Sequence, residues 1–158
     1  MTEGGGKRVL LIGYGNPARE DDGLGPAVAE IVDKLNIPGL TVESDYQLAV
    51  EDAADIAEHD LVVFVDACVD CEGPYSFTEV EPSMDISFST HSVEPEILMG
   101  MATQLFKAGT KGYALGIRGY SFEMFKEEMT EKAVGNMGKA VEFLLGILQT
   151  GHIPPANP

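Results

Sequence analysis

Residues 13–25, with the sequence GYGNPAREDDGLG, join two stretches of different periodicity. The stretch before them, residues 8–12, is a short apolar run typical of a buried strand. The stretch after them has apolar residues at the spacing of one helix face, namely Leu24, Val28, Ile31, Val32 and Leu35. A strand, a short loop and a helix in this order predict an α/β fold, with the loop at the carboxyl end of the first strand.

Three consecutive acids, Glu20, Asp21 and Asp22, lie in this loop. Open α/β sheets bind ligands at the carboxyl ends of their strands, so unpaired acids there need an explanation. One interpretation is that Asp21 or Asp22 caps the following helix, whose first turn has free N–H groups and a positive dipole end. Capping accounts for one acid only. The alternative is that at least one carboxylate faces a cation or a reacting group.

The rest of the chain alternates strands with helices. Further strands are expected at residues 40–44, 61–66, 75–80 and 113–117, and helices at 23–34, 49–58, 94–106 and 130–148. This alternation predicts a mostly parallel sheet with helices on both faces. Only about eight residues separate Asp66 from Tyr75, fewer than a parallel crossover needs, so the fourth strand should run antiparallel to the third.

Length, composition and charge limit the possible classes. We expect one domain over residues 7–149, a flexible leader at 1–6 and a disordered tail at 150–158. A net charge of −16 argues against binding to nucleic acid or anionic lipid. No apolar run approaches the ~20 residues of a membrane span, and no signal peptide is visible. With two cysteines and no export signal, we expect a cytoplasmic protein. We also expect a monomer.

Two further residues could act together with Asp22. Asp66 ends the most apolar strand, where an unpaired carboxylate is costly to bury, although it could instead cap the following turn. His91 lies just before a predicted helix, whose positive end favours a neutral, metal-binding imidazole, although it could instead hydrogen-bond within a loop. Two oxygens and one nitrogen suit a borderline ion such as Ni²⁺ or Zn²⁺.

Other chemically versatile residues have plainer interpretations. Cys68 and Cys71 form C-x-x-C, which can be a redox or metal pair. There is no second pair to complete a zinc site, and this one follows a strand instead of opening a helix. We therefore expect two small residues in a tight connection that are dispensable for activity. We expect His59 on the surface, and His152 lies in the tail.

Together these motifs resemble the hydrogenase maturation proteases, endopeptidases that trim the C-terminal extension of the large subunit of nickel-iron hydrogenases. The matching pieces are GYGNPAREDDGLG, the aspartate of VVFVDA and the histidine of STHSVEP, with YQLAVEDAADIA and ALGIRGYSFE also similar. The resemblance spans roughly residues 8–148. It implies a three-layer α/β/α sandwich of the phosphorylase/hydrolase-like class, around a five-stranded, mostly parallel sheet with strand four antiparallel.

The resemblance also implies a site and a substrate. The residues that would contact metal and take part in catalysis are Asp22, Asp66 and His91, and some family members carry Glu at the position of Asp22. The implied metal is nickel already inserted in the large-subunit precursor, with no permanent cofactor, and cadmium or zinc would be substitutes in crystals. The nickel would mark the precursor as loaded. Whether it also polarises the scissile carbonyl or activates water stays open.

Two other classes of protein share parts of the pattern. In a dinucleotide-binding oxidoreductase, Gly13, Gly15 and Ala18 would satisfy G-x-G-x-x-A after a strand, but the acids that follow would repel a pyrophosphate. A phosphoacceptor receiver domain also has acids after its first strand and an Asp after its third. There the acidic pair follows the strand directly and a Lys ends strand five, whereas here residues 13–20 intervene and Arg118 follows Ile117.

Overall fold

The computed structural model describes residues 7–84, 93–151 and 153. The predicted strands and helices are all present, with shifted ends, and a short 3-10 helix, η1, is added after the first loop. The expected leader at 1–6 lies outside the described residues, as does most of the expected tail. In chain order the elements are β1 Val9–Tyr14, η1 Glu20–Gly23, α1 Leu24–Asp33, β2 Leu40–Asp45, α2 Asp52–Ala57, β3 Leu61–Cys68, β4 Tyr75–Val80, α3 Pro95–Phe106, β5 Lys111–Arg118 and α4 Glu131–Thr150.

The five strands form one mixed sheet in the order β2-β1-β3-β5-β4. The pairs β1–β2, β1–β3 and β3–β5 are parallel, and β4 pairs with β5 antiparallel. The direction predicted for strand four is therefore confirmed. Because β1 has β2 on one side and β3 on the other, the chain reverses its winding at the carboxyl ends of β1 and β3, where such sheets bind ligands.

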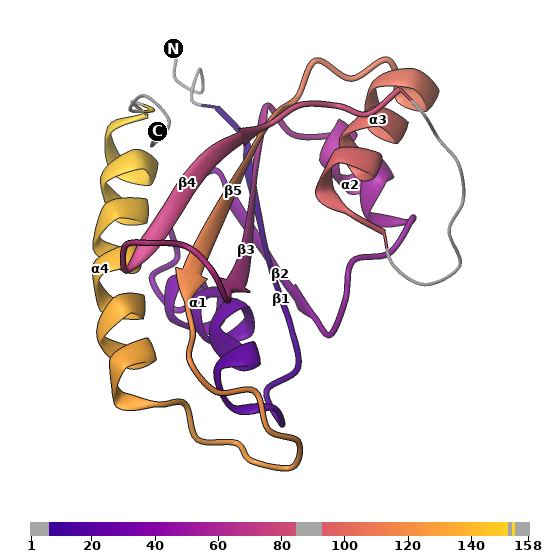
Figure 1. Ribbon diagram of the computed structural model, residues 1–158. Helices are drawn as coiled ribbons and strands as arrows, with labels where there is room; N and C mark the ends of the chain where they lie inside the picture. The colour runs from indigo at the N-terminus through magenta and orange to yellow at the C-terminus, as the bar shows by residue number, and fades with distance from the viewer. Residues whose placement is uncertain (1–6, 85–92, 152, 154–158) are drawn as a thin grey trace.

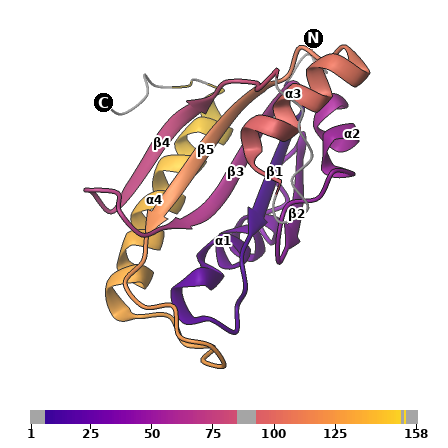
Figure 2. The same ribbon diagram turned by 45° about the vertical axis from the view of Figure 1, so that its right-hand side comes forward.

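Helices cover both faces of the sheet and make a three-layer α/β/α sandwich (Figures 1 and 2). One apolar core lies under α1 and α4 and the other under α2 and α3. Ile31 and Leu35 were predicted to share the buried face of α1, but they are 38% and 50% exposed. Ile31 lies on the flank of the buried stripe, and Leu35 lies beyond the last residue of α1. None of the described helices has the length and apolar composition needed to cross a bilayer.

Two glycines bring the start of α1 against the sheet. Gly15 has φ of 142°, and a Cβ there would collide with the carbonyl oxygen of Asp22. A Cβ on Gly25 would collide with the carbonyl oxygens of Tyr14 and Val65, at the ends of β1 and β3. The absence of both side chains lets η1 and α1 fold back over the strand ends. This close approach places the acidic loop at the carboxyl edge of the sheet.

Candidate active site

A cavity of about 240 Å³ lies at the carboxyl ends of β1 and β3. Asp22, from η1, and Asp66, from β3, both line it, so the structure brings these two predicted site residues together. The third, His91, lies outside the described residues. The other lining residues come from the end of β1, the segment after β2 and the entry to α3: Tyr14, Gly15, Tyr46, Gln47, Leu48, Val93 and Glu94.

Asp66 has an unfavourable environment for a negative charge. Its Oδ1 accepts a hydrogen bond of 2.7 Å from the N–H of Ala67, which is the local backbone contact expected of a turn-capping Asp. Burial nevertheless raises the pKa of Asp66 to about 6, and the nearby charges of Asp22 and Glu94 act in the same direction. The hydroxyl of Tyr14 donates to Asp66 and partly offsets this effect. The cavity would therefore be stabilised by a positive charge.

Asp22 helps to shape the loop that carries it. Its Oδ2 accepts a hydrogen bond of 2.8 Å from the N–H of Asn16, and the Nη1 of Arg19 lies 4.0 Å away. The Asn16 side chain in turn accepts from the N–H of Ala18 at 2.9 Å. These bonds hold the Asp22 side chain against the cavity while leaving it 24% exposed. Asp22 can therefore still accept a ligand.

Asp21 points the other way and is fully buried. Its carboxylate accepts from the N–H groups of Tyr120 (2.7 Å), Ser121 (3.1 Å) and Thr130 (2.8 Å), and from the Thr130 hydroxyl (2.8 Å). Burial alone would raise the pKa of Asp21, but these donors outweigh it and lower the pKa. Glu20 adds a bond of 2.7 Å from the Ser121 hydroxyl. We call Glu20, Asp21 and their partners in residues 120–130 the loop clasp.

The expectation that Asp21 or Asp22 caps the following helix is wrong. The N-cap residue of α1 is Gly23, and no side chain caps that end. Asp21 bonds to the loop clasp and Asp22 to the loop of Asn16. The three acids therefore divide between holding a distant loop and lining the cavity.

No family model and no curated protein matches the sequence. Among solved structures, HycI from Thermococcus kodakarensis, a nickel-iron hydrogenase maturation protease, superposes with a TM-score of 0.71 and 25% identity over 92% of this chain and 95% of its own. A hydrogenase 2 maturation peptidase from a Thaumarchaeota archaeon superposes with a TM-score of 0.68 and 25% identity, over 90% of this chain and 99% of its own. HybD from Escherichia coli, 19% identical with a TM-score of 0.66 over 91% and 93%, shares the fold.

The chain is similar in fold and in sequence to hydrogenase maturation proteases. The resemblance inferred from the motifs is thus confirmed, and so is the enzyme class, a peptidase. Neither an oxidoreductase nor a receiver domain is needed to explain the acidic loop. Within this maturation-protease fold, the cavity with Asp22 and Asp66 occupies the sheet edge at which α/β proteins bind ligands.

Sequence reasoning missed two residues of this candidate site. Tyr14 was expected beyond the end of the first strand, but β1 continues through it and directs its hydroxyl to Asp66. Burial, together with the charge of Asp66, raises the pKa of Tyr14. Glu94, the N-cap residue of α3, lines the cavity and adds negative charge. A strand prediction that ran through Tyr14 would have placed its side chain beside the next strand.

A second acidic group lies on the α2 side of β2. Ligand oxygens of Glu43, Asp52 and Asp55 all lie within 4.8 Å of one another. Burial, followed by the charges of Asp55 and Asp52, raises the pKa of Glu43 to about 7. These three residues do not line the Asp22–Asp66 cavity. They make the edge of the sheet at β2 strongly acidic.

The two cysteines form a tight turn after β3. The N–H of Cys71 lies 3.0 Å from the Sγ of Cys68, and the Nη1 of Arg118 donates to the carbonyl of Cys71 at 2.7 Å. Both thiols are free. Burial, with Cys68 beside it, raises the pKa of Cys71 to about 12, which disfavours a nucleophilic thiolate. That the pair is dispensable stays a prediction.

Proposed function

We propose that this chain is an endopeptidase that removes the C-terminal extension of a nickel-iron hydrogenase large-subunit precursor after nickel has been inserted. The observation that carries the proposal is that Asp22 and Asp66 share one cavity at the carboxyl edge of a maturation-protease fold. The solved relatives with this fold are described as hydrogenase maturation proteases. The metal belongs to the substrate in this proposal, and the enzyme has no permanent cofactor.

The electrostatics of the cavity support recognition of a cation carried by the substrate. Asp66 is near Asp22 and Glu94, and this proximity raises the free energy of its ionised form. A divalent ion entering the cavity would relieve that repulsion and would find carboxylate oxygens as ligands. Tyr14 donates to Asp66 and would orient the remaining acceptor sites. Precursor without nickel brings no cation to relieve the repulsion between the carboxylates, so the site discriminates loaded from unloaded substrate.

The ligand set proposed here is Asp22, Asp66 and His91. His91 is included because its motif follows the first two in the order and context of the family resemblance. Three protein ligands leave coordination positions open for the groups by which the precursor already holds its nickel. The same residues would lie next to the scissile peptide bond.

The proposal is tested with purified precursor, with and without nickel, and with three versions of the enzyme. Wild type should cleave only the nickel-loaded precursor, detected by the loss of mass of the C-terminal extension. Asp22→Asn keeps the size and the acceptor for Asn16 but removes the charge, so cleavage should slow on the order of 100-fold or more. Asp22→Glu restores the carboxylate and should recover much of the rate.

Folding is checked on each variant by urea denaturation, so that a lost activity can be assigned to the site. Equal cleavage of nickel-free precursor would rule out nickel recognition. Wild-type rates for Asp22→Asn would remove Asp22 from the site, and the acidic loop would then be explained by loop contacts alone.

A further inference from the structure

The strand β2 leaves one edge of the sheet open. β2 is the end strand, paired with β1 on one side only. The N–H groups of Val9 and Gly15 donate to the carbonyls of Gly39 and Asp45, which sets the phase of the parallel ladder. Bonding alternates along such a ladder, so Val42 and Ser44 direct their backbone N–H and C=O groups away from β1. In the described part of the chain no backbone partner reaches them there.

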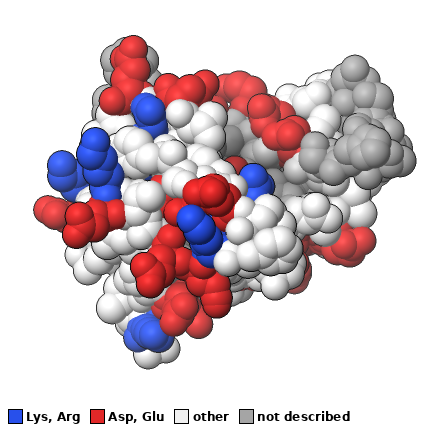
Figure 3. Space-filling view, turned by 60° about the horizontal axis from the view of Figure 1, so that its bottom comes forward, with Lys and Arg blue, Asp and Glu red and all other residues white. Residues whose placement is uncertain are grey.

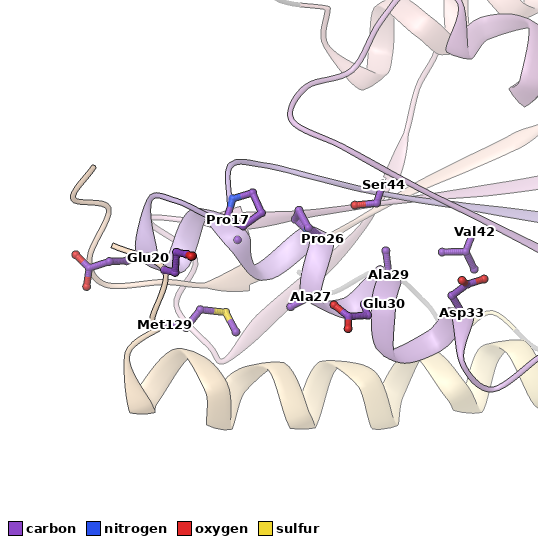
Figure 4. A pocket seen from close by; sticks show the side chains of 12 residues that line it. Pro17, Glu20, Pro26, Ala27, Ala29, Glu30, Asp33, Val42, Ser44 and Met129 are labelled. Carbon is purple, nitrogen blue, oxygen red and sulfur yellow. The ribbon is translucent and has the colours of Figure 1, made fainter. Parts of the chain in front are cut away.

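A groove runs beside this open edge. A cavity of about 480 Å³ lies between β2 and α1, and Figure 4 shows Val42 and Ser44 of β2 facing the helix. A second cavity, of about 210 Å³, shares Ser44 with the first and Tyr46 with the Asp22–Asp66 cavity. The three cavities therefore follow one another from the active site along β2. We call the cavities of about 480 and 210 Å³ together the β2 groove. Its lining includes Pro17, Pro26, Glu30, Asp33, Val42 and Ser44.

All the charged residues that line the β2 groove are acidic. They are Glu20, Glu30, Asp33, Asp45 and Glu127. Lys34, outside the lining, pairs with Glu30 at 3.2 Å and neutralises only part of this charge. Figure 3 shows that acidic side chains also outweigh basic ones over the end of the molecule at which the parallel strands finish.

The opposite face of β2 is acidic as well, because Glu43, Asp52 and Asp55 gather there. A strand added to the edge would direct its side chains alternately to the two faces of the sheet. Its side chains would therefore meet carboxylates on both faces. Negative charge on both faces beside the open edge would attract a segment with positive side chains. It would repel a second copy of this protein, whose net charge is −16.

We propose that the β2 groove binds an extended, Lys- or Arg-bearing segment of the substrate protein as an added strand on β2, leading that segment into the Asp22–Asp66 cavity. Main-chain hydrogen bonds to the open edge give affinity independent of sequence, and the acids on both faces select positive side chains. The six residues of β2 would pair with a segment about 20 Å long. This inference rests on the proposed function for the identity of the substrate protein.

Binding is tested first without any metal or cleavage, by fluorescence anisotropy with a labelled peptide of alternating Lys and Thr. The wild-type protein should bind this peptide, and the affinity should fall steeply as salt is raised. A peptide of alternating Glu and Thr should not bind. The Lys-Thr peptide with an N-methyl group on every residue keeps its charge but has no backbone N–H to donate along either edge, and should bind about tenfold more weakly. Equal binding of the methylated peptide would overturn strand addition.

The location is tested with charge reversals. The double variant Glu30→Lys with Asp33→Lys changes the groove, and Glu81→Lys with Glu142→Lys makes the same change in net charge at exposed positions away from it. The groove variant should bind the Lys-Thr peptide about tenfold more weakly and raise KM for nickel-loaded precursor, whereas the control should match wild type. Urea denaturation checks that both variants fold.

The outcomes separate the two proposals. If wild type cleaves nickel-loaded precursor and the groove variant has an unchanged KM and peptide affinity, the groove proposal is overturned and the proposed function stands. If the Lys-Thr peptide binds through the groove but precursor is not cleaved, the peptide site stands and the substrate assignment fails.

Discussion

Asp21 and Asp22 are adjacent in sequence but belong to two regions with opposite electrostatics. In the loop clasp, Asp21 is buried among hydrogen-bond donors from residues 120–130, and its pKa is lowered. In the cavity, Asp22 faces Asp66, whose pKa is raised to about 6. Burial acts against the charged form of Asp21 and Asp66 alike. What differs is whether the protein surrounds the carboxylate with donors or with other carboxylates.

The two regions should respond to pH in opposite ways. Asp21 has a lowered folded-state pKa, so its contribution is present at neutral pH and is lost as pH falls through that pKa. Asp66 has a folded-state pKa of about 6 against an ordinary value of 3.8, so the folded state binds more protons between these values. Asp66 therefore lowers stability as pH rises through that window. At neutral pH the loop clasp stabilises the folded state. The acids of the cavity destabilise it, and they are available to bind a cation.

The largest effect is expected from breaking the clasp with Asp21→Ala. This variant leaves the donors of Tyr120, Ser121 and Thr130 without their acceptor in a buried place. Because each unsatisfied buried group costs about 1–3 kcal/mol, the free energy of unfolding should fall by at least ~3 kcal/mol in urea denaturation. Asp22→Asn, the neighbouring control, should change it by less than about 1 kcal/mol. Similar losses for the two variants would mean that the two acids have the same role.

A smaller effect is expected in the cavity from Tyr14→Phe. The hydroxyl of Tyr14 is a donor that lowers the pKa of Asp66, so its removal should raise that pKa further. The acidic limb of the pH–rate profile for cleavage should move to higher pH, with a rate about threefold to tenfold lower near pH 6 that recovers toward pH 8. Tyr75→Phe, on the opposite edge strand β4, is the matched control and should leave the profile in place. A uniform loss of rate at every pH would instead indicate a positioning role for Tyr14.

The contrast between the regions also explains what the sequence could predict. The direction of β4 followed from the short link after Asp66, and the meeting of Asp22 with Asp66 followed from their places at two strand ends. These are local or topological facts. The partners of Asp21 lie 99 to 109 residues away, in a segment with no regular pattern, so the sequence suggested only helix capping or a cation-facing role for this acid. Hydrogen bonds between distant loops leave no periodic signal.

The smallest effect is expected from Glu43→Gln, which extends the comparison to the acidic group beside β2. Glu43 lies near Asp52 and Asp55, and its pKa is about 7 against an ordinary value of 4.5. The folded state therefore binds more protons between about pH 4.5 and 7, and stability falls as pH rises through this range. Gln imitates the protonated form at all pH values, so the variant should melt about 2–4 °C higher at pH 8, the shift that ~1 kcal/mol produces in a domain of this size. At pH 4.5 the variant and wild type should have the same melting temperature.

Glu51→Gln, at the exposed N-cap of α2, removes the same charge outside the group and should shift the melting temperature less. A Glu43→Gln variant that is less stable at pH 8 would show that the ionised carboxylate is held by donors, as Asp21 is, and not opposed by its acidic neighbours.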